Sequence, residues 1–222
     1  LYGEVVAAAH DYQLHGGELD AFDQRLLVGL GRHVCAHWCD PDKGIWESRA
    51  EPRHHVHSKV LCWVALDRLL ELHHAGRLDA PVDLFVHHRS AIRSAVEDRG
   101  FNPTLGSYVS YFDADVVDAS LLLLPVYGYC RADDPRMRTT YDVLQQRLQV
   151  NGHLYRYRGD YQEGLPPGEG AFGICAFWAV ELECLRGNVA AARALFEQQL
   201  EAANDLGLLS DCLLYTSPSP RD

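Results

Sequence analysis

Apolar residues recur at intervals of three and four along most of this 222-residue chain, and this spacing constrains the fold more than any other feature. The clearest apolar stripe on one helix face consists of Leu19, Phe22, Leu26, Leu30, Val34 and Trp38. The same spacing predicts helices over 54–75, 82–96, 171–186 and 189–203, and shorter ones over 2–14, 116–124 and 135–149. The pattern therefore predicts an all-α fold of about eight helices.

The connections between these helices alternate in length. Those at 76–79 and 187–188 are tight, whereas those at 40–53, 99–115 and 151–169 are long. Two patches, Ser107–Phe112 and His153–Arg158, alternate in polarity as short strands do. A ring of helical hairpins produces such an alternation, with tight turns at one end and site-building loops at the other. An irregular helical bundle produces it as well.

The two ends of the chain differ from its middle. It opens on Leu1 inside an apolar, helix-like stretch and contains a single methionine, Met137, so we expect it to be part of a longer protein. Residues 212–222 lack periodicity, contain Pro-Ser-Pro and resemble a translated sequencing adapter; a natural disordered tail is the alternative. We therefore divide the chain into one partial domain, 1–211, and a non-native-looking tail, 212–222.

Charge and composition exclude several partners. The net charge is −11, from 20 basic and 31 acidic residues, and no basic stripe exists that could bind nucleic acid. Apolar runs such as Leu121–Val126 are too short to span a membrane. An odd number of cysteines, seven, and the lack of a signal peptide favour a reducing compartment, so we expect a cytoplasmic location.

The densest group of metal-ligand residue types is His33, Cys35, His37 and Cys39. Each like pair shares a helix face, but the two pairs point about 160° apart at 100° per residue, so one tetrahedral ion cannot take all four. The sequence has no CxxC, and its other histidine groups lack HExxH spacing. We therefore expect no metal site.

The connection at 40–59 has a different character. It contains Trp46, Glu47 and, two residues later, Arg49. Together these provide an aromatic surface for the C–H patches of a sugar, a proton donor for a glycosidic oxygen and a hydrogen-bonding cation. From residue types alone, the more common arrangement is a loop that starts a helix and contains a buried tryptophan beside a solvated glutamate.

This segment resembles the signature of glycoside hydrolase family 15. Gly44-Ile-Trp-Glu47 matches the segment that carries the family's general acid, and Pro52-Arg-His…His57-Ser-Lys59 matches the segment that opens the next helix. Further blocks follow in the family's order: Asp118–Pro125, Tyr155–Tyr157, Glu163–Phe172 and Asn204–Ser210. The resemblance thus extends over residues 40–211.

The resemblance implies an all-α catalytic domain, an (α/α)6 barrel of six helical hairpins, with no cofactor. The family removes glucose from α-glucans or cleaves trehalose, with inversion at the anomeric carbon, so the implied partner is an α-linked glucose oligosaccharide or trehalose. From the positions of the matching blocks, residues 1–211 are about helices four to eleven of twelve. We therefore expect an incomplete barrel, and the isolated 222-residue chain to be inactive.

The resemblance also implies roles for individual residues. Glu47 matches the general acid, and Asp211 stands where the family has its catalytic base, a glutamate. If the adapter starts at the third base of that codon, Asp211 is a junction artefact of Glu. The implied sugar contacts are Trp46, Arg49, Arg156 and Glu169.

Several of these positions have alternatives. Each arginine could form a surface salt bridge, and Glu169 could be a helix-start carboxylate. We expect Asp118 to cap the helix that follows it rather than to contact a ligand. Ala50 stands where the family usually has Gly, and His55-Val56 where it usually has Phe-Thr, which predicts a slightly different loop shape.

The sequence thus predicts an inverting hydrolase that releases glucose from α-glucosidic linkages, a glucoamylase-like enzyme. The first alternative is an α,α-trehalase of the same family. The second is an inactive fragment or a non-catalytic helical binding protein.

Overall fold

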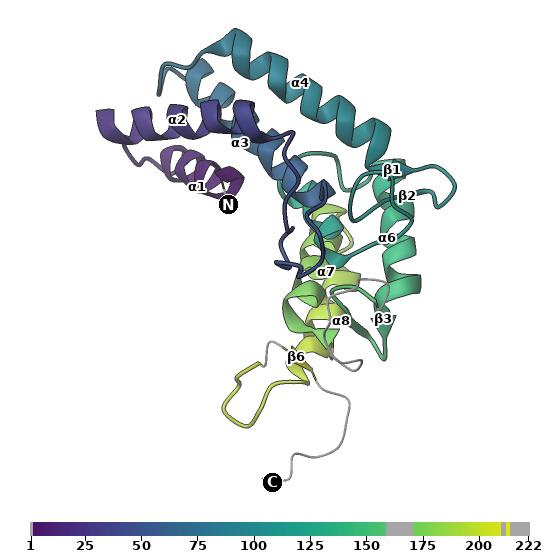
Figure 1. Cartoon of the computed structure of the whole chain (residues 1–222). Coiled ribbons are helices and arrows are strands. Elements are labelled where there is room, and N and C mark those ends of the chain that lie inside the picture. Colours follow the sequence, from purple (N-terminus) through teal and green to yellow (C-terminus); the bar gives the residue numbers. More distant parts are fainter. Residues whose placement is uncertain (1, 159–170, 210–211, 214–222) are drawn as a thin grey trace.

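The computed structural model describes residues 2–158, 171–209 and 212–213. Its α-helices are α1 (Tyr2–Leu14), α2 (Ala21–His37), α3 (Val56–His74), α4 (Val82–Arg99), α5 (Leu123–Val126), α6 (Pro135–Leu148), α7 (Gly173–Leu185) and α8 (Val189–Leu200). A 3₁₀ helix, η1 (Ala119–Leu122), directly precedes α5. Figure 1 shows the helices following one another in an arc from α1 and α2 to α7 and α8. The predicted all-α class is confirmed.

Helices alternate between the inside and the outside of this arc. Most residues of α3 are buried, and it packs against both α1 and α4. By contrast, α2 and α4 bury only one stripe each, and η1 and α5 are buried almost throughout. Helices α7 and α8 form the next pair. The arrangement is a series of helical hairpins with inner and outer members, as expected for part of an (α/α)6 barrel.

Loop length follows the same alternation. Short connections lead from inner to outer helices, as at 75–81 and 186–188. Long ones lead from an outer helix to the next inner one, at 38–55, 100–118 and 149–172, the last only partly described. Because all three return to the inner ring, their ends meet at one side of the arc.

Short strands lie within the long connections or after them. They form antiparallel pairs: β1 (Phe101–Asn102) with β2 (Ser107–Tyr108), β3 (Gln149–Val150) with β4 (His153–Leu154), and β5 (Ala171–Phe172) with β6 (Cys212–Leu213). The two strand-like patches are confirmed only at their first two residues. The first two residues of the tail set apart above are those of β6.

The predicted helix over 116–124 is shorter and tighter than expected. The Asp118 side chain accepts hydrogen bonds from the backbone N–H and the hydroxyl of Ser120, which starts a 3₁₀ turn, and the former is 2.8 Å long. Asp118 is therefore the N-cap that we expected. A better-formed cap is the box of Asp20 and Asp23 at the start of α2, where each side chain accepts from the other's backbone N–H.

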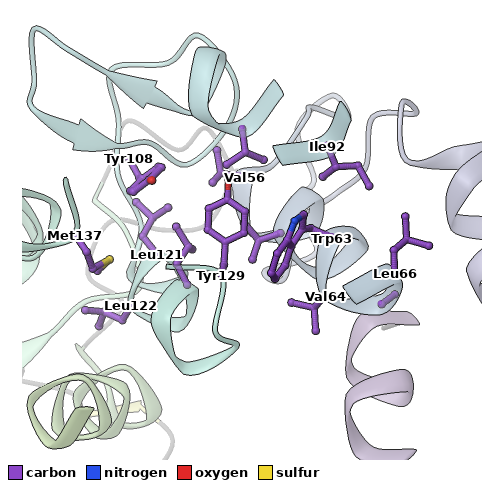
Figure 2. Close-up of a cluster of buried hydrophobic side chains, with 14 of the residues drawn as sticks. Val56, Trp63, Val64, Leu66, Ile92, Tyr108, Leu121, Leu122, Tyr129 and Met137 are labelled. Carbon is purple, nitrogen blue, oxygen red and sulfur yellow. The ribbon is translucent and has the colours of Figure 1, made fainter. Parts of the chain in front are cut away.

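The core joins the inner helices to the long connections (Figure 2). Trp63 of α3 meets Tyr129 edge to face, with ring centres 5.2 Å apart, and the Arg93 guanidinium lies 4.8 Å from the Tyr129 ring centre. Around them Figure 2 shows buried apolar side chains from α3, α4, η1 and α6, among them Val64, Ile92, Leu121, Leu122 and Met137. One continuous core thus fixes the hairpins relative to one another.

Two polar clusters fasten the outer helices. Glu97 of α4 accepts hydrogen bonds from the hydroxyls of Tyr129 (2.7 Å) and Tyr108 (3.1 Å), and it forms an ion pair with Arg136 of α6 (2.8 Å). Because Glu97 is charged, these are stronger than neutral hydrogen bonds. They tie α4 to α6 and to the connection between them.

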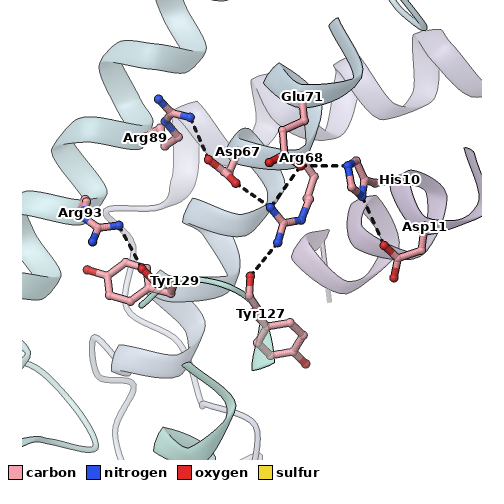
Figure 3. Close-up of polar contacts among 9 residues, drawn as sticks. All are labelled: His10, Asp11, Asp67, Arg68, Glu71, Arg89, Arg93, Tyr127 and Tyr129. Carbon is pink, nitrogen blue, oxygen red and sulfur yellow. Dashed lines mark hydrogen bonds and ion pairs between the residues drawn. The ribbon is translucent and has the colours of Figure 1, made fainter. Parts of the chain in front are cut away.

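The second cluster, in Figure 3, surrounds Asp67 of α3. Its carboxylate forms ion pairs with Arg68 (2.7 Å) and with Arg89 of α4 (2.8 Å), and Arg68 also donates to the carbonyl oxygen of Tyr127 (2.9 Å). Burial raises the pKa of Asp67 against the opposing effect of the two arginines. The cluster therefore fixes α3 against α4 and α5, although its carboxylate is costly to bury.

His33, Cys35 and His37 lie on α2, but Cys39 lies beyond its end, so the expected sharing of one helix face by the two cysteines is not confirmed. Cys35 is buried, which raises the pKa of its thiol to about 11, whereas Cys39 is exposed. The His33 and His37 rings lie 4.4 Å apart on the other face. Within the described residues, no group of three or more His, Cys, Asp or Glu side chains is placed to hold a metal ion. Nor is any described helix both long and apolar enough to cross a membrane.

His57, in the first turn of α3, is buried without a compensating hydrogen bond. It is 3% exposed, and among the described residues its Nε2 atom has no hydrogen-bond partner. Burial lowers the pKa of His57 to about 4, from an ordinary value of 6.5. The imidazole is therefore neutral in the folded protein near neutral pH.

Protonation of His57 should destabilise the fold in acid. Because the folded-state pKa lies below the unfolded one, the stabilisation is present above pH 6.5 and is lost as the pH falls toward 4. The loss is on the order of 3 kcal/mol at 1.36 kcal/mol per pKa unit. Urea unfolding between pH 7.5 and 4 should show this slope in the unmodified protein and a flatter one in His57→Gln. The matched variant His74→Gln, at an exposed position of the same helix, should keep the full slope; equal slopes in all three would contradict the assignment.

Candidate active site

The connection from α2 to α3, residues 38–55, carries Glu47 and is called the Glu47 loop below. Gly44–Glu47 form a turn, closed by hydrogen bonds from Glu47 N–H to the Gly44 carbonyl (3.2 Å) and from Ser48 N–H to the Lys43 carbonyl (3.0 Å). Glu47 is exposed and has a φ of 49°, in the left-handed region. A residue other than glycine there costs about 1–3 kcal/mol and persists only where its surroundings fix it.

The surroundings of the Glu47 loop do fix it. Asp42 and Arg53 exchange both backbone hydrogen bonds at 2.8 Å, which closes the loop at its base. His55 forms a similar bridge with Tyr111 of the α4–η1 connection. Gly44 lies against the His55 ring, since a Cβ at Gly44 would come within about 3.0 Å of ring atoms. The loop is thus held both by itself and by the neighbouring long connection.

Trp46 lies in an aromatic cluster whose other members come from α7, from β5 and from the α6–α7 connection. Its ring centre is 5.8 Å from that of Trp178 on α7, 6.0 Å from Phe172 of β5 and 6.3 Å from Tyr157 of the α6–α7 connection. The indole is half-buried, and among the described residues its shielded Nε1 atom has no hydrogen-bond partner. Such a cluster presents aromatic faces to whatever binds beside it.

Arg156 joins this cluster from about 110 residues further along the chain. Its guanidinium carbon lies 4.9 Å from the Tyr157 ring centre, 5.5 Å from that of Phe172 and 5.9 Å from that of Trp46. Its carbonyl oxygen accepts a hydrogen bond of 2.8 Å from Ala119 N–H. The start of η1 therefore positions Arg156, and the structure brings Arg156 and Trp46 together.

Asp118 lies beneath this part of the structure. It is 2% exposed, and burial raises its pKa, with the hydrogen bonds from Ser120 acting in the other direction. His55 and Cys175 are also buried, and burial lowers the pKa of His55 and raises that of the Cys175 thiol. These groups form the support of the cluster rather than its accessible surface.

Of the three remaining predicted site residues, only Arg49 is among the residues that the structure describes. Arg49 is exposed on the Glu47 loop, two residues after Glu47. Glu169 and Asp211 lie outside the described residues. The strand pair β5–β6 brings Cys212–Leu213 beside Ala171–Phe172, and Phe172 contacts Trp46.

Trp178 is the cluster member that the sequence analysis missed. It lies on α7, where an aromatic residue at helical spacing usually belongs to the core. Only its position beside Trp46, far away in the sequence, shows that it lines the cluster.

This arrangement suits a sugar ring. The aromatic faces can cover the C–H patches of a pyranose, the Arg156 guanidinium can donate to hydroxyl groups, and the Glu47 carboxyl group can give a proton to an oxygen. Glu47 directly follows Trp46, so the proton donor and the stacking surface belong to one turn.

Comparison with known proteins identifies the relatives of this chain. It is 36% identical over 211 residues to a trehalase of Thermoplasma acidophilum, and 33% identical over 215 residues to a trehalase of Mycobacterium tuberculosis. Each alignment covers 95% of this chain, but only 36% and 31% of the relatives. The chain thus spans about a third of the length of the curated relatives that it matches.

Solved structures show the same fold. A wild-type glycosidase superposes with a TM-score of 0.78 at 22% identity, over 96% of this chain and 55% of the other. A glycosidase variant in complex with glucose gives 0.77 over the same shares. The helical hairpins therefore have the same fold as the matched part of these structures. The sequence profile of the glycosyl hydrolases family 15 matches residues 2–213. The chain belongs to glycosyl hydrolase family 15.

Proposed function

We propose that the protein containing this chain is an α,α-trehalase, which hydrolyses trehalose to two glucose molecules with inversion. The observation that supports this choice is that curated relatives 33–36% identical over 95% of the chain are trehalases. The sequence alone favours the glucoamylase-like activity over trehalase, and the relatives favour the reverse order. Family membership supports the broader statement, hydrolysis of an O-glycosidic bond.

In the proposed reaction Glu47 protonates the glycosidic oxygen as general acid. A second carboxylate activates water on the opposite face of the sugar, and in inverting enzymes the two carboxyl groups are about 6.5–9.5 Å apart. We assign the base to position 211, as the family resemblance implies. The reaction requires neither metal nor organic cofactor.

The sugar contacts are assigned in the same way. Trp46 and Arg156 would hold the glucose residue, because the aromatic cluster and the guanidinium share one surface. Arg49 would reach the sugar from the Glu47 loop, and Glu169 would contact it from the α6–α7 connection.

Substrate preference tests the choice of trehalase. The full-length protein should hydrolyse trehalose with a kcat/KM at least about tenfold above that for maltose or maltotriose, because a site that hydrogen-bonds one disaccharide leaves polar groups unsatisfied with another. Glucose release with each sugar under identical conditions measures this. A preference for maltose and maltotriose would instead establish the glucoamylase-like activity.

Removal of the acidic proton tests the role of Glu47. Glu47→Gln keeps the size of the side chain but cannot protonate the leaving oxygen, so kcat for trehalose should fall by about 10²–10⁴-fold. Glu51→Gln, on the same loop and equally exposed, is the matched control and should retain activity. Retained activity in Glu47→Gln would refute the assignment. Trehalose binding by calorimetry, without hydrolysis by the unmodified protein, would favour the non-catalytic binding protein.

A further inference from the structure

Asp42, at the base of the Glu47 loop, makes side-chain contacts in addition to the backbone hydrogen bonds that close the loop. Its Oδ1 atom accepts hydrogen bonds from Gly44 N–H (2.8 Å) and from the Ser58 hydroxyl (2.6 Å). Its Oδ2 atom faces the Lys59 ammonium at 3.5 Å. One carboxylate thus joins the turn that holds Glu47 to the first turns of α3.

The partner Lys59 is an unusual residue to find on the most buried helix. It is 2% exposed, and its ammonium group also donates to the carbonyl oxygen of Asp40 at 2.5 Å. A buried charge is tolerated when it is paired and hydrogen-bonded, and removing one partner is costly. The Asp42–Lys59 pair therefore fixes the base of the loop to the buried first turns of α3.

The turn itself depends on this fixed base. The contact from Asp42 to Gly44 N–H is an Asx turn, which sets the direction in which the chain enters the Gly44–Glu47 turn. Two backbone hydrogen bonds close the turn that follows, and Glu47 adopts its left-handed conformation at the end of that turn. Without the carboxylate, the entry to the strained turn loses its side-chain hydrogen bond and keeps only the backbone bonds of the loop and the packing of Gly44 on His55.

We propose that Asp42 is a positioning residue: through Gly44, Ser58 and Lys59 it fixes the turn that aims the carboxyl group of Glu47 at the leaving oxygen. This inference rests on the proposed role of Glu47 as general acid. Asp42 itself touches no reacting atom. A displacement of the acid by about 1 Å would cost on the order of 10²-fold in rate.

The leaving group of the substrate separates this role from general damage to the site. Departure of a sugar from trehalose needs a proton from the acid, whereas fluoride leaves α-glucosyl fluoride without one. A residue that acts through the acid is therefore important for trehalose and nearly dispensable for the fluoride. A residue that merely holds the site together affects both.

The experiment compares Asp42→Ala with Asp40→Ala in the full-length protein on both substrates. Alanine is used because the Oδ1 atom of an asparagine would still accept from Gly44 N–H and from Ser58. Asp40 is the matched control because its side chain pairs with exposed His37, and only its backbone carbonyl meets Lys59. Asp42→Ala should lower kcat for trehalose by about 10²-fold with KM changed less than about threefold, and should spare the fluoride. Asp40→Ala should change neither. An equal loss on both substrates, or no loss, would overturn the proposal.

A double-mutant cycle sharpens the test. If Asp42 acts only through the acid, Asp42→Ala should add nothing to the loss already caused by Glu47→Gln. Independent losses that multiply would show a separate role and overturn the proposal. If Asp42→Ala does not fold, as thermal melting would show, the pair Asp42→Ala/Lys59→Met removes the uncompensated charge and should give the same selective loss.

Failure of the proposed function is distinguishable from failure of this inference. If the unmodified protein hydrolyses neither sugar nor the fluoride, the proposed function is wrong. The positioning is then decided by hydrogen exchange, since the Glu47 and Ser48 amides close the turn. Faster exchange of both in Asp42→Ala than in Asp40→Ala supports the positioning, and unchanged exchange overturns it.

Discussion

The burial of α3 is the constraint on which the rest of the structure depends. A helix that is covered on nearly all sides needs neighbours on each, and α1, α4 and the η1–α5 segment provide them. Its two buried charges must be paired as well: Asp67 meets arginines near one end, and Lys59 meets Asp42 near the other. The same helix therefore sets the spacing of the hairpins and the position of the Glu47 loop.

The helices could be predicted from the sequence because apolar periodicity is a local signal. The choice between a ring of hairpins and an irregular bundle could not, since it depends on which helices are covered on several sides; the burial of α3 and of η1–α5 decides it. The strands were foreseen at Ser107 and His153 but not at their partners Phe101 and Gln149. Two-residue strands leave too little alternation to detect.

The candidate site divides in the same way. Trp46, Glu47 and Arg156 were found through blocks that resemble a family, and the structure brings Trp46 and Arg156 onto one surface. The contributions of Trp178 and the Asp42–Lys59 pair arise from contacts between distant parts of the chain, which residue types do not reveal. The relatives favour the other order of substrates, trehalase before a glucoamylase-like enzyme, and the residue types in the matched blocks do not separate the two.

At position 47, the residue that best suits the left-handed backbone differs from the residue that the proposed chemistry needs. Glycine adopts a φ of 49° without strain, so a glycine there would relieve about 1 kcal/mol or more while deleting the carboxyl group. A selection for higher thermal stability alone would therefore remove the residue that the proposed reaction needs most. Engineering of this protein should hold position 47 fixed and look for added stability in the outer helices, away from the long connections.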